Sequence, residues 1–199
     1  MKPTPVFESY WRFASERHAM FERRLRNPKG PWTSDAILNT YRFTNSFRAA
    51  DRVSQYLIGE VQLGIGRPQS PEELFFRTML FKLFNKIETW EALADEMGEF
   101  TSETFDYELA GHVLDRLREQ GDTIYSAAYI MPSPPYGHAR KHRNHLALLG
   151  KMMEARLPSR IAQLPNLKDV FEGLLAWPGL GRFLAFQFTI DLNYSAITR

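Results

Sequence analysis

Hydrophobic positions recur at helical spacing along nearly the whole chain, and sustained two-residue alternation is missing. Clusters of glycine, proline and asparagine separate these runs. The pattern predicts helices over residues 5–26, from a cap at 33–35 to near 58, from 71 to about 87, over 89–97, 101–120, 142–153 and 166–176, and after 181. The sequence therefore predicts an all-α fold.

Two helix starts carry clear capping signals. Thr33, Ser34 and Asp35 offer side chains that can cap a following helix. Ser70 precedes Pro71 and two glutamates, which places a cap before a proline in the first turn. The segments GEVQLGIGRPQSP and IMPSPPYGHARKH are predicted loops, and the GxG of the first lacks the preceding strand that a dinucleotide site needs.

A tight turn opens the last predicted helix. Pro178, Gly179 and Gly181 lie directly before helical spacing resumes at Phe183. A turn of this kind exposes backbone N–H groups, which can bind a phosphate. The alternative is an ordinary connection between two packed helices.

Composition describes a globular chain and restricts its chemistry. With 199 residues, 44% hydrophobic and 24% charged, we expect one domain over residues 1–199. No apolar run approaches the roughly 20 residues that span a bilayer, and the N-terminus lacks a signal-peptide layout. The absence of cysteine excludes disulfides and thiolate nucleophiles and is consistent with the cytoplasm. We therefore expect no membrane partner.

Charge is unevenly distributed although the net charge is only +2. Acidic residues dominate 88–122, whereas basic residues dominate 12–29 and 138–160. Segregated basic segments suit a polyanion, and a solvated surface is the alternative. His138, His142 and His145 lie among arginine and lysine, so we expect polyanion contact or exposure there and no metal. Neither a GxxxxGK[ST] loop nor a GxSxG elbow is present.

Three polar stripes interrupt the apolar helices. They comprise Arg42, Asn45, Arg48 and Asp51 with Arg52, then Arg77, Lys82, Asn85 and Lys86, and finally Gln187, Asp191, Asn193 and Tyr194. An unpaired charge is costly to bury, so these cations must be exposed or paired. They form either an ion-pair network that joins helices or a cleft whose cations hold phosphate oxygens while Asp191 acts as a base.

Four segments in order carry a resemblance to a known family: RFTNSFRAADRVSQYLI, FRTMLFKLFNKIETWEAL, IYSAAYIM and WPGLGRFLAFQFTIDLNYS. They resemble the alpha-glutamyl/putrescinyl thymine pyrophosphorylase family, whose relatives include the helical domain of 5-hydroxymethyldeoxyuridine DNA kinases. The resemblance implies a helix-hairpin-helix fold similar to that of DNA glycosylases. Residues 178–181 would be the hairpin, with amides that face a DNA phosphate.

The resemblance also implies a reaction. Phage enzymes of this kind act on 5-hydroxymethyluracil in DNA that has been activated by phosphorylation, and an amine replaces the phosphate-type leaving group. We therefore expect a DNA-modifying transferase of the infected bacterial cytoplasm. Its partners would be DNA with modified thymine and an amino acid or polyamine, and no cofactor is expected.

Site roles follow from this chemistry. Arg42, Arg48, Arg77 and Lys82 would hold the departing phosphate, and Asp191 would accept the proton of the amine. The expected substrate-binding residues are Asn45, Asp51, Asn85, Gln187, Asn193 and Tyr194. The expected DNA-binding residues are Gly179, Gly181, Arg182, Arg140, Lys141 and Arg143. The reacting base would have to leave the stack.

One departure from the family concerns the end of the chain. Members are expected to continue past DLNYS into a glycine-rich motif, whereas this sequence ends at Arg199. We therefore expect a fragment or a second polypeptide that completes the fold. Two other functions are open: a noncatalytic DNA-binding lobe of a kinase or modification complex, and a base-excision glycosylase. Asp191 lies ten positions after Gly181, closer than expected for a glycosylase aspartate.

Overall fold

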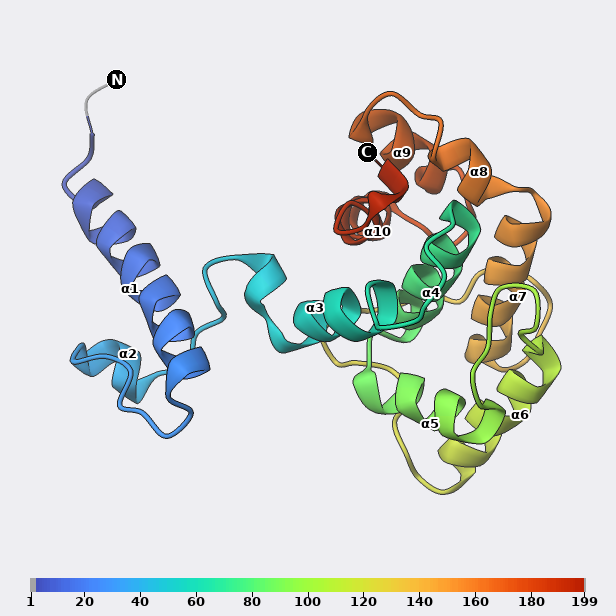
Figure 1. Cartoon of the computed structure of the whole chain (residues 1–199), viewed down its shortest axis with the longest axis horizontal. Helices are drawn as coiled ribbons and strands as arrows, with labels where there is room; N and C mark the ends of the chain where they lie inside the picture. The colour runs from blue at the N-terminus through green and yellow to red at the C-terminus, as the bar shows by residue number, and fades with distance from the viewer. Residues whose placement is uncertain (1–2, 199) are drawn as a thin grey trace. The chain divides into compact units, whose positions relative to one another are not determined.

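The computed structural model describes residues 3–198, and every regular element in that range is helical (Figure 1). The prediction of an all-α protein is thus confirmed. The chain divides between Gln55 and Tyr56 into two compact units, here called unit 1 and unit 2 and described separately. The expected single domain therefore contains two compact parts. Among the described helices, none combines the length and apolar character needed to cross a bilayer.

Unit 1 contains α1 (Phe7–Arg26), α2 (Ala36–Thr40), η1 (Arg48–Ala50) and most of α3 (Arg52–Tyr56). Few of its apolar side chains are buried, and none lies on α1. Side chains bonded to backbone oxygens hold it together instead. Arg17 donates to Thr44, and the Ser46 hydroxyl donates to the carbonyl of Ala14 at 2.7 Å.

The prediction of one continuous helix from residue 35 to 58 is wrong. Asp35 caps α2 as expected, but Tyr41 leaves the helical conformation and residues 41–47 are not helical. This stretch is rich in threonine, asparagine and serine. Their side chains form hydrogen bonds with backbone groups and so compete with the backbone hydrogen bonds of a helix. The Asn45 amide, for example, donates to the carbonyl of Ala50 at 2.5 Å. The first polar stripe is therefore not a helical face.

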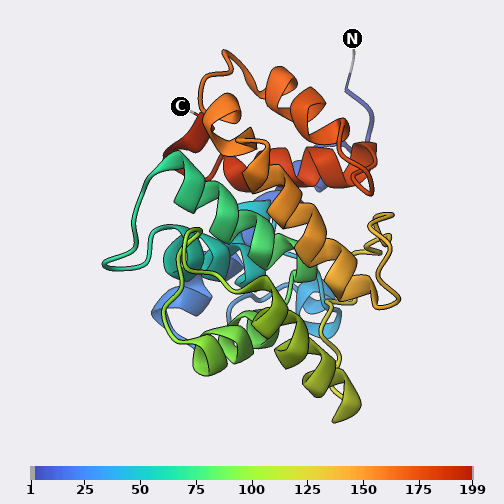
Figure 2. The same cartoon turned by 90° about the vertical axis from the view of Figure 1, so that its right-hand side faces the viewer.

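Unit 2 is built around α4 (Pro71–Phe84), in which every residue from Glu73 to Phe84 is buried. The elements packed against it are η2 (Leu57–Gln62), α5 (Ile87–Met97), α7 (Lys141–Glu154), α8 (Leu157–Ile161), α10 (Arg182–Leu192) and η3 (Ala196–Thr198). Figure 2 shows α7 beside α4. A helix that is apolar on nearly all sides belongs in the centre of a bundle.

Several element boundaries differ from those predicted. The loop expected at 59–71 begins only after η2 ends at Gln62. Helix α6 (Tyr107–Glu119) starts six residues later than expected because Asp106 caps it, accepting from the amides of Glu108 and Leu109 at 2.9 Å. The short helix α8 was not predicted.

The last two helices are joined by the proline–glycine turn. Helix α9 (Leu167–Leu175) packs against α10, and residues 176–181 connect them. Gly179 has a φ of 85°, and a Cβ there would lie 3.2 Å from the Pro134 Cβ. Glycine is needed at this position both for the backbone conformation and for the close approach. The turn thus fixes how α10 enters the bundle.

Candidate functional site

A buried ion pair links the central helix to α10. Lys82 on α4 lies 3.3 Å from the Asp191 carboxylate on α10, with both side chains almost inaccessible to solvent. Lys82 also donates to the Asn85 side chain at 2.5 Å. Asn85 ends α4 in the left-handed conformation, with a φ of 51°, and this turns its side chain back toward Lys82.

Tyr129 and Gln187, which are both half-buried, connect this pair to the surface. The Lys82 ammonium lies 5.1 Å from the centre of the Tyr129 ring. The Tyr129 hydroxyl approaches the Gln187 amide oxygen at 3.5 Å. We call Lys82, Asn85, Tyr129, Gln187 and Asp191 the central cluster. Four of these residues are predicted site residues, whereas Tyr129 was missed as a site residue although it lies in the IYSAAYIM segment.

The position of α10 is fixed from the opposite side. The Gln62 side chain donates to the backbone carbonyl of Asp191 at 2.8 Å and to the Thr78 hydroxyl at 2.9 Å. Because Gln62 is fully buried, these bonds are shielded from water. Nothing in the sequence pattern singled out Gln62, since it lay in a predicted loop.

The first turns of α10 present a distinct surface. Gly181 is the N-cap of α10 without a side-chain capping bond, and Arg182 is exposed. Phe183 and Phe186 are 59% and 54% exposed. The Phe183 ring lies 5.7 Å from the ring of Tyr129. We call Gly181, Arg182, Phe183 and Phe186 the hairpin face.

Spacing along α10 connects this face to the central cluster. Phe183, Gln187 and Asp191 are four residues apart, so they lie on one side of the helix. Exposure decreases along this row, from Phe183 through the half-buried Gln187 to the buried Asp191. Asn193 and Tyr194 lie at the other end of α10, where Asn193 accepts a hydrogen bond from Thr198 at 2.9 Å. They are thus remote from the hairpin face.

Arg77 is enclosed within unit 2. Its guanidinium lies 3.0 Å from the Glu73 carboxylate and donates to the carbonyls of Val61, Gln62 and Pro68. Every nitrogen of the guanidinium is engaged, and the residue is 1% exposed. For Arg77, this geometry favours the alternative of an ion-pair network that joins segments over the predicted phosphate contact.

The first polar stripe lies in unit 1 and its residues have separate environments. Arg42 and Asn45 line a pocket, and Arg48 is half-buried in η1. Asp51 caps α3 by accepting from the amides of Val53 and Ser54. The predicted cationic clamp is therefore divided between the two units.

Much of the basic segment 138–160 is paired with the acidic segment before it. On α6, Asp115 lies 2.9 Å from the Arg143 guanidinium and 3.4 Å from that of Arg140. Burial raises the pKa of Asp115, but the Arg143 hydrogen bond and neighbouring cations lower it more, so the net shift is downward. Lys141 donates to the carbonyl of Met131 at 3.1 Å. These contacts favour a structural role for the three predicted DNA ligands Arg140, Lys141 and Arg143.

The expectation that the clustered histidines are exposed or contact a polyanion is wrong for two of them. His142 and His145 are buried rather than exposed. His142 lies 2.9 Å from Asp115, and His145 lies within hydrogen-bond distance of the Tyr125 hydroxyl and the Pro132 carbonyl. Within residues 3–198, no three histidine, aspartate or glutamate side chains gather as a metal site.

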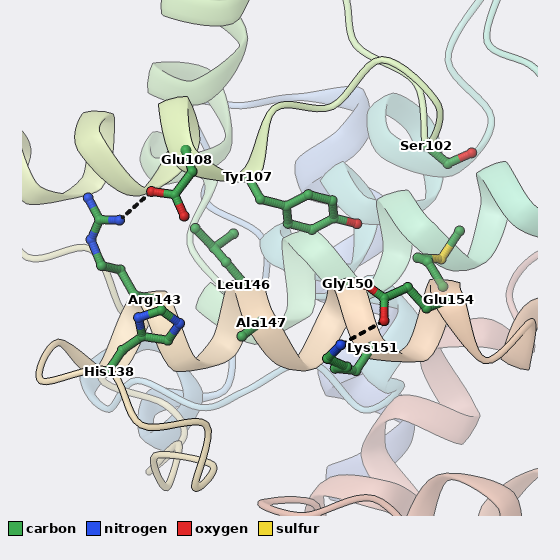
Figure 3. Close-up of a pocket in the computed structure, with 11 residues that line it drawn as sticks. Ser102, Tyr107, Glu108, His138, Arg143, Leu146, Ala147, Gly150, Lys151 and Glu154 are labelled. Atoms are coloured by element: carbon green, nitrogen blue, oxygen red, sulfur yellow. Dashed lines mark hydrogen bonds and ion pairs between the residues drawn. The ribbon is translucent and has the colours of Figure 1, made fainter.

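A pocket of about 390 Å³ lies along α7 (Figure 3). Its floor includes Tyr107, Leu146 and Ala147. The ion pairs of Arg143 with Glu108 and of Lys151 with Glu154 flank it. Arg143 is the only predicted site residue that lines this pocket, and it is neutralised by its carboxylate partners.

Comparison with known proteins assigns the chain to a family. Residues 4–199 match the family model described as "5-hmdU DNA kinase, helical domain". A curated relative, the "5-hmdU DNA kinase" of Bacillus phage SP10, is 28% identical over 203 residues. That alignment covers 94% of this chain but only 31% of the relative, so the chain spans about a third of the relative's length. No solved structure matches the chain. The kinase part of the expected resemblance is thus confirmed, and the pyrophosphorylase part stays a prediction.

Proposed function

Because this chain belongs to the family of 5-hmdU DNA kinase helical domains, we propose that it binds 5-hydroxymethyluracil in DNA and takes part in thymine hypermodification. The observation that carries the proposal is the central cluster beside the hairpin face. Polar groups able to read a base lie directly behind an aromatic ring, next to an exposed helix start.

The residues of the central cluster suit a uracil ring. Gln187 offers both a donor and an acceptor, which can match the N3–H and a carbonyl of uracil. Tyr129 supplies a face for stacking. Because the Watson–Crick edge of the base is paired in the duplex, the base would turn out of the stack to present this edge to Gln187.

The hairpin face suits the duplex around such a base. Free amides at the start of α10, with Arg182, would bind a backbone phosphate. Phe183 and Phe186 are apolar wedges of the type that enters a base step and fills the space left by an extruded base. In this proposal α9 and α10 form the helix-hairpin-helix.

The finer proposal is amine transfer. The nitrogen of a neutral amine attacks the 5-methylene carbon, and the carbon–oxygen bond to the phosphate breaks with its electron pair leaving on the phosphate. Lys82 would stabilise that anion, and Asp191 would take the amine proton. The Lys82–Asp191 pair favours this reaction, which requires Tyr129 to move aside.

Binding is tested by fluorescence anisotropy with duplexes that differ only by one 5-hydroxymethyluracil in place of thymine. We expect tighter binding of the modified duplex. Gln187→Ala should lose affinity for both duplexes, because the N3–H and the carbonyls of the base are common to thymine and 5-hydroxymethyluracil. Lys151→Ala, at an exposed position on α7 outside the central cluster, is the control and should retain this affinity. Equal affinity of the unaltered chain for both duplexes would contradict the proposal.

The reaction is tested on duplexes that carry 5-phosphomethyluracil, with glutamate or putrescine present and nucleoside mass spectrometry as the readout. An amine adduct supports the transferase. Bound but unchanged DNA would indicate the noncatalytic lobe, and release of free base would indicate a glycosylase. Full transfer by Asp191→Asn would remove Asp191 from the mechanism.

A further inference from the structure

Unit 1 contains a second pocket that the central cluster does not explain. It has a volume of about 460 Å³ and lies between α1 and the segment 38–45. Its lining includes three arginines, Arg17, Arg24 and Arg42. It also includes four aromatic residues, Phe21, Trp32, Tyr41 and Phe43.

Among the described residues that line this pocket, none carries a carboxylate. In the sequence of unit 1, ten lysines and arginines stand against five aspartates and glutamates, whereas unit 2 has 15 against 18. Three of the acidic residues of unit 1 have partners of their own. Glu16 lies 2.7 Å from Arg23, Glu22 lies 3.5 Å from His18, and Asp35 caps α2. The pocket therefore keeps a positive charge that an anion would neutralise.

Two of the three arginines are positioned by neutral groups. Arg17 donates to the Thr44 carbonyl at 2.9 Å, and Arg24 donates to the Asn45 amide oxygen at 3.3 Å. Arg42 is exposed, and among residues 3–198 it has no hydrogen bond or ion pair. Neutral acceptors orient a guanidinium without cancelling its charge, so each can still bind a phosphate oxygen.

The aromatic residues indicate what accompanies the phosphate. Trp32 is half-buried, Tyr41 is 64% exposed, and the Arg24 guanidinium lies 6.0 Å from the Trp32 ring. Sites for single-stranded nucleic acid combine cations that follow the backbone with rings on which bases stack. A concave pocket can take an unstacked base, whereas the bases of a duplex present no free face.

We propose that this pocket binds one nucleotide of a single DNA strand, with its phosphate on Arg24 and Arg42 and its base against Trp32 or Tyr41. This site has a different role from the base-binding site of the proposed function. Neither its cations nor its rings select a 5-substituent.

The test measures anisotropy of labelled oligo(dT), which contains no modified base, with the full chain. We expect Arg24→Gln/Arg42→Gln to bind at least about tenfold more weakly and to flatten the dependence of log affinity on log salt by about 0.7, the value for one single-strand phosphate contact. Arg26→Gln removes a charge from the same helix outside the pocket, so it is the matched control and should flatten the slope less.

A second variant separates stacking from charge. Trp32→Leu should weaken oligo(dT) binding and keep the salt slope. Equal binding by the double variant and the Arg26 control would overturn the proposal, as would an unchanged affinity of Trp32→Leu and Tyr41→Leu together. Free thymidine monophosphate should displace the strand only at millimolar concentration, and displacement at micromolar concentration would assign the pocket to a free nucleotide instead. Discrimination of 5-hydroxymethyluracil from thymine should persist in all these variants, so the two proposals can fail separately.

Discussion

Lys82 keeps a charge inside unit 2 because α10 supplies a carboxylate 3.3 Å away and Asn85 supplies an acceptor. Arg77 is stabilised in the same way by Glu73 and three carbonyls. Both cations lie on α4, yet only Lys82 has a half-buried aromatic residue beside it. Residue type alone could not separate these two roles.

The buried pair should behave as one unit in a double-mutant cycle. Lys82→Met or Asp191→Leu alone leaves a buried charge without its partner and should cost about 3–5 kcal/mol of unfolding free energy. The double variant should lose less unfolding free energy than the two single variants added together, because it leaves no unpaired charge in the interior. Urea unfolding measures all three. Lys151→Ala removes an exposed ion pair and should cost far less than either single variant. Additive single effects would contradict this coupling.

His145 should make stability depend on pH. Burial lowers its pKa to about 4, although the Pro132 carbonyl opposes this shift. Between about pH 6.5 and 4 the unfolded chain therefore binds a proton that the folded chain does not. The contribution of His145 to the free energy of unfolding is fully present above pH 6.5 and decreases as the pH is lowered. By pH 4 the protein has lost about 3 kcal/mol of stability through this residue.

Urea unfolding between pH 7 and 4 measures this loss. His145→Gln should flatten the pH dependence, since glutamine cannot titrate. His138→Gln, at an exposed position, should leave it unchanged. An equal slope for wild type and His145→Gln would mean that His145 does not titrate differently on folding.

Among the elements, the long uniform helices were predicted best. α4, α5, α7 and α9 lie within a few residues of their predicted positions. The long helix expected after Asp35 fails because side-chain bonds such as that of Asn45 to Ala50 offer the backbone another partner. Such competition depends on contacts that periodicity does not encode.

The turn before α10 should tolerate no side chain at Gly179. Gly179→Ala places a Cβ in a positive-φ conformation and against Pro134, so we expect a loss of about 1–3 kcal/mol. Gly173→Ala, inside α9 with no neighbouring atom within 4 Å of its Cβ, should instead gain about 0.5–1 kcal/mol. Thermal unfolding measures both. A neutral Gly179→Ala would show that the turn can relax.

At the scale of the whole molecule, the two units differ in charge and in the number of buried apolar residues, and the sequence did not indicate this division. Arg140 and Arg143 of the basic segment 138–160 are neutralised by carboxylates of the acidic segment 88–122, namely Glu108, Asp115 and Glu119. The basic character is left in unit 1. The apolar core lies almost wholly in unit 2, since Leu38 and Ala50 are the buried apolar residues described in unit 1.

This division predicts unequal protection from hydrogen exchange. α1 buries no side chain, whereas α4 is buried from Glu73 to Phe84. Amides of α1 should therefore exchange at least about tenfold faster than those of α4, a difference of at least about 1.4 kcal/mol in opening free energy. Exchange followed by mass spectrometry measures this. Equal protection of the two helices would contradict it.

The sequence by itself determined the all-helical class, most helix positions and the residue types of the candidate site, because periodicity and capping are local properties. It did not determine which charged residues meet. Only the packing of α10 against α4 brings Asp191 to Lys82, and only the packing of α6 against α7 cancels Arg143 with Asp115. Ion pairing depends on distances of a few ångströms between segments far apart in the chain, and those distances exist only once the helices have packed.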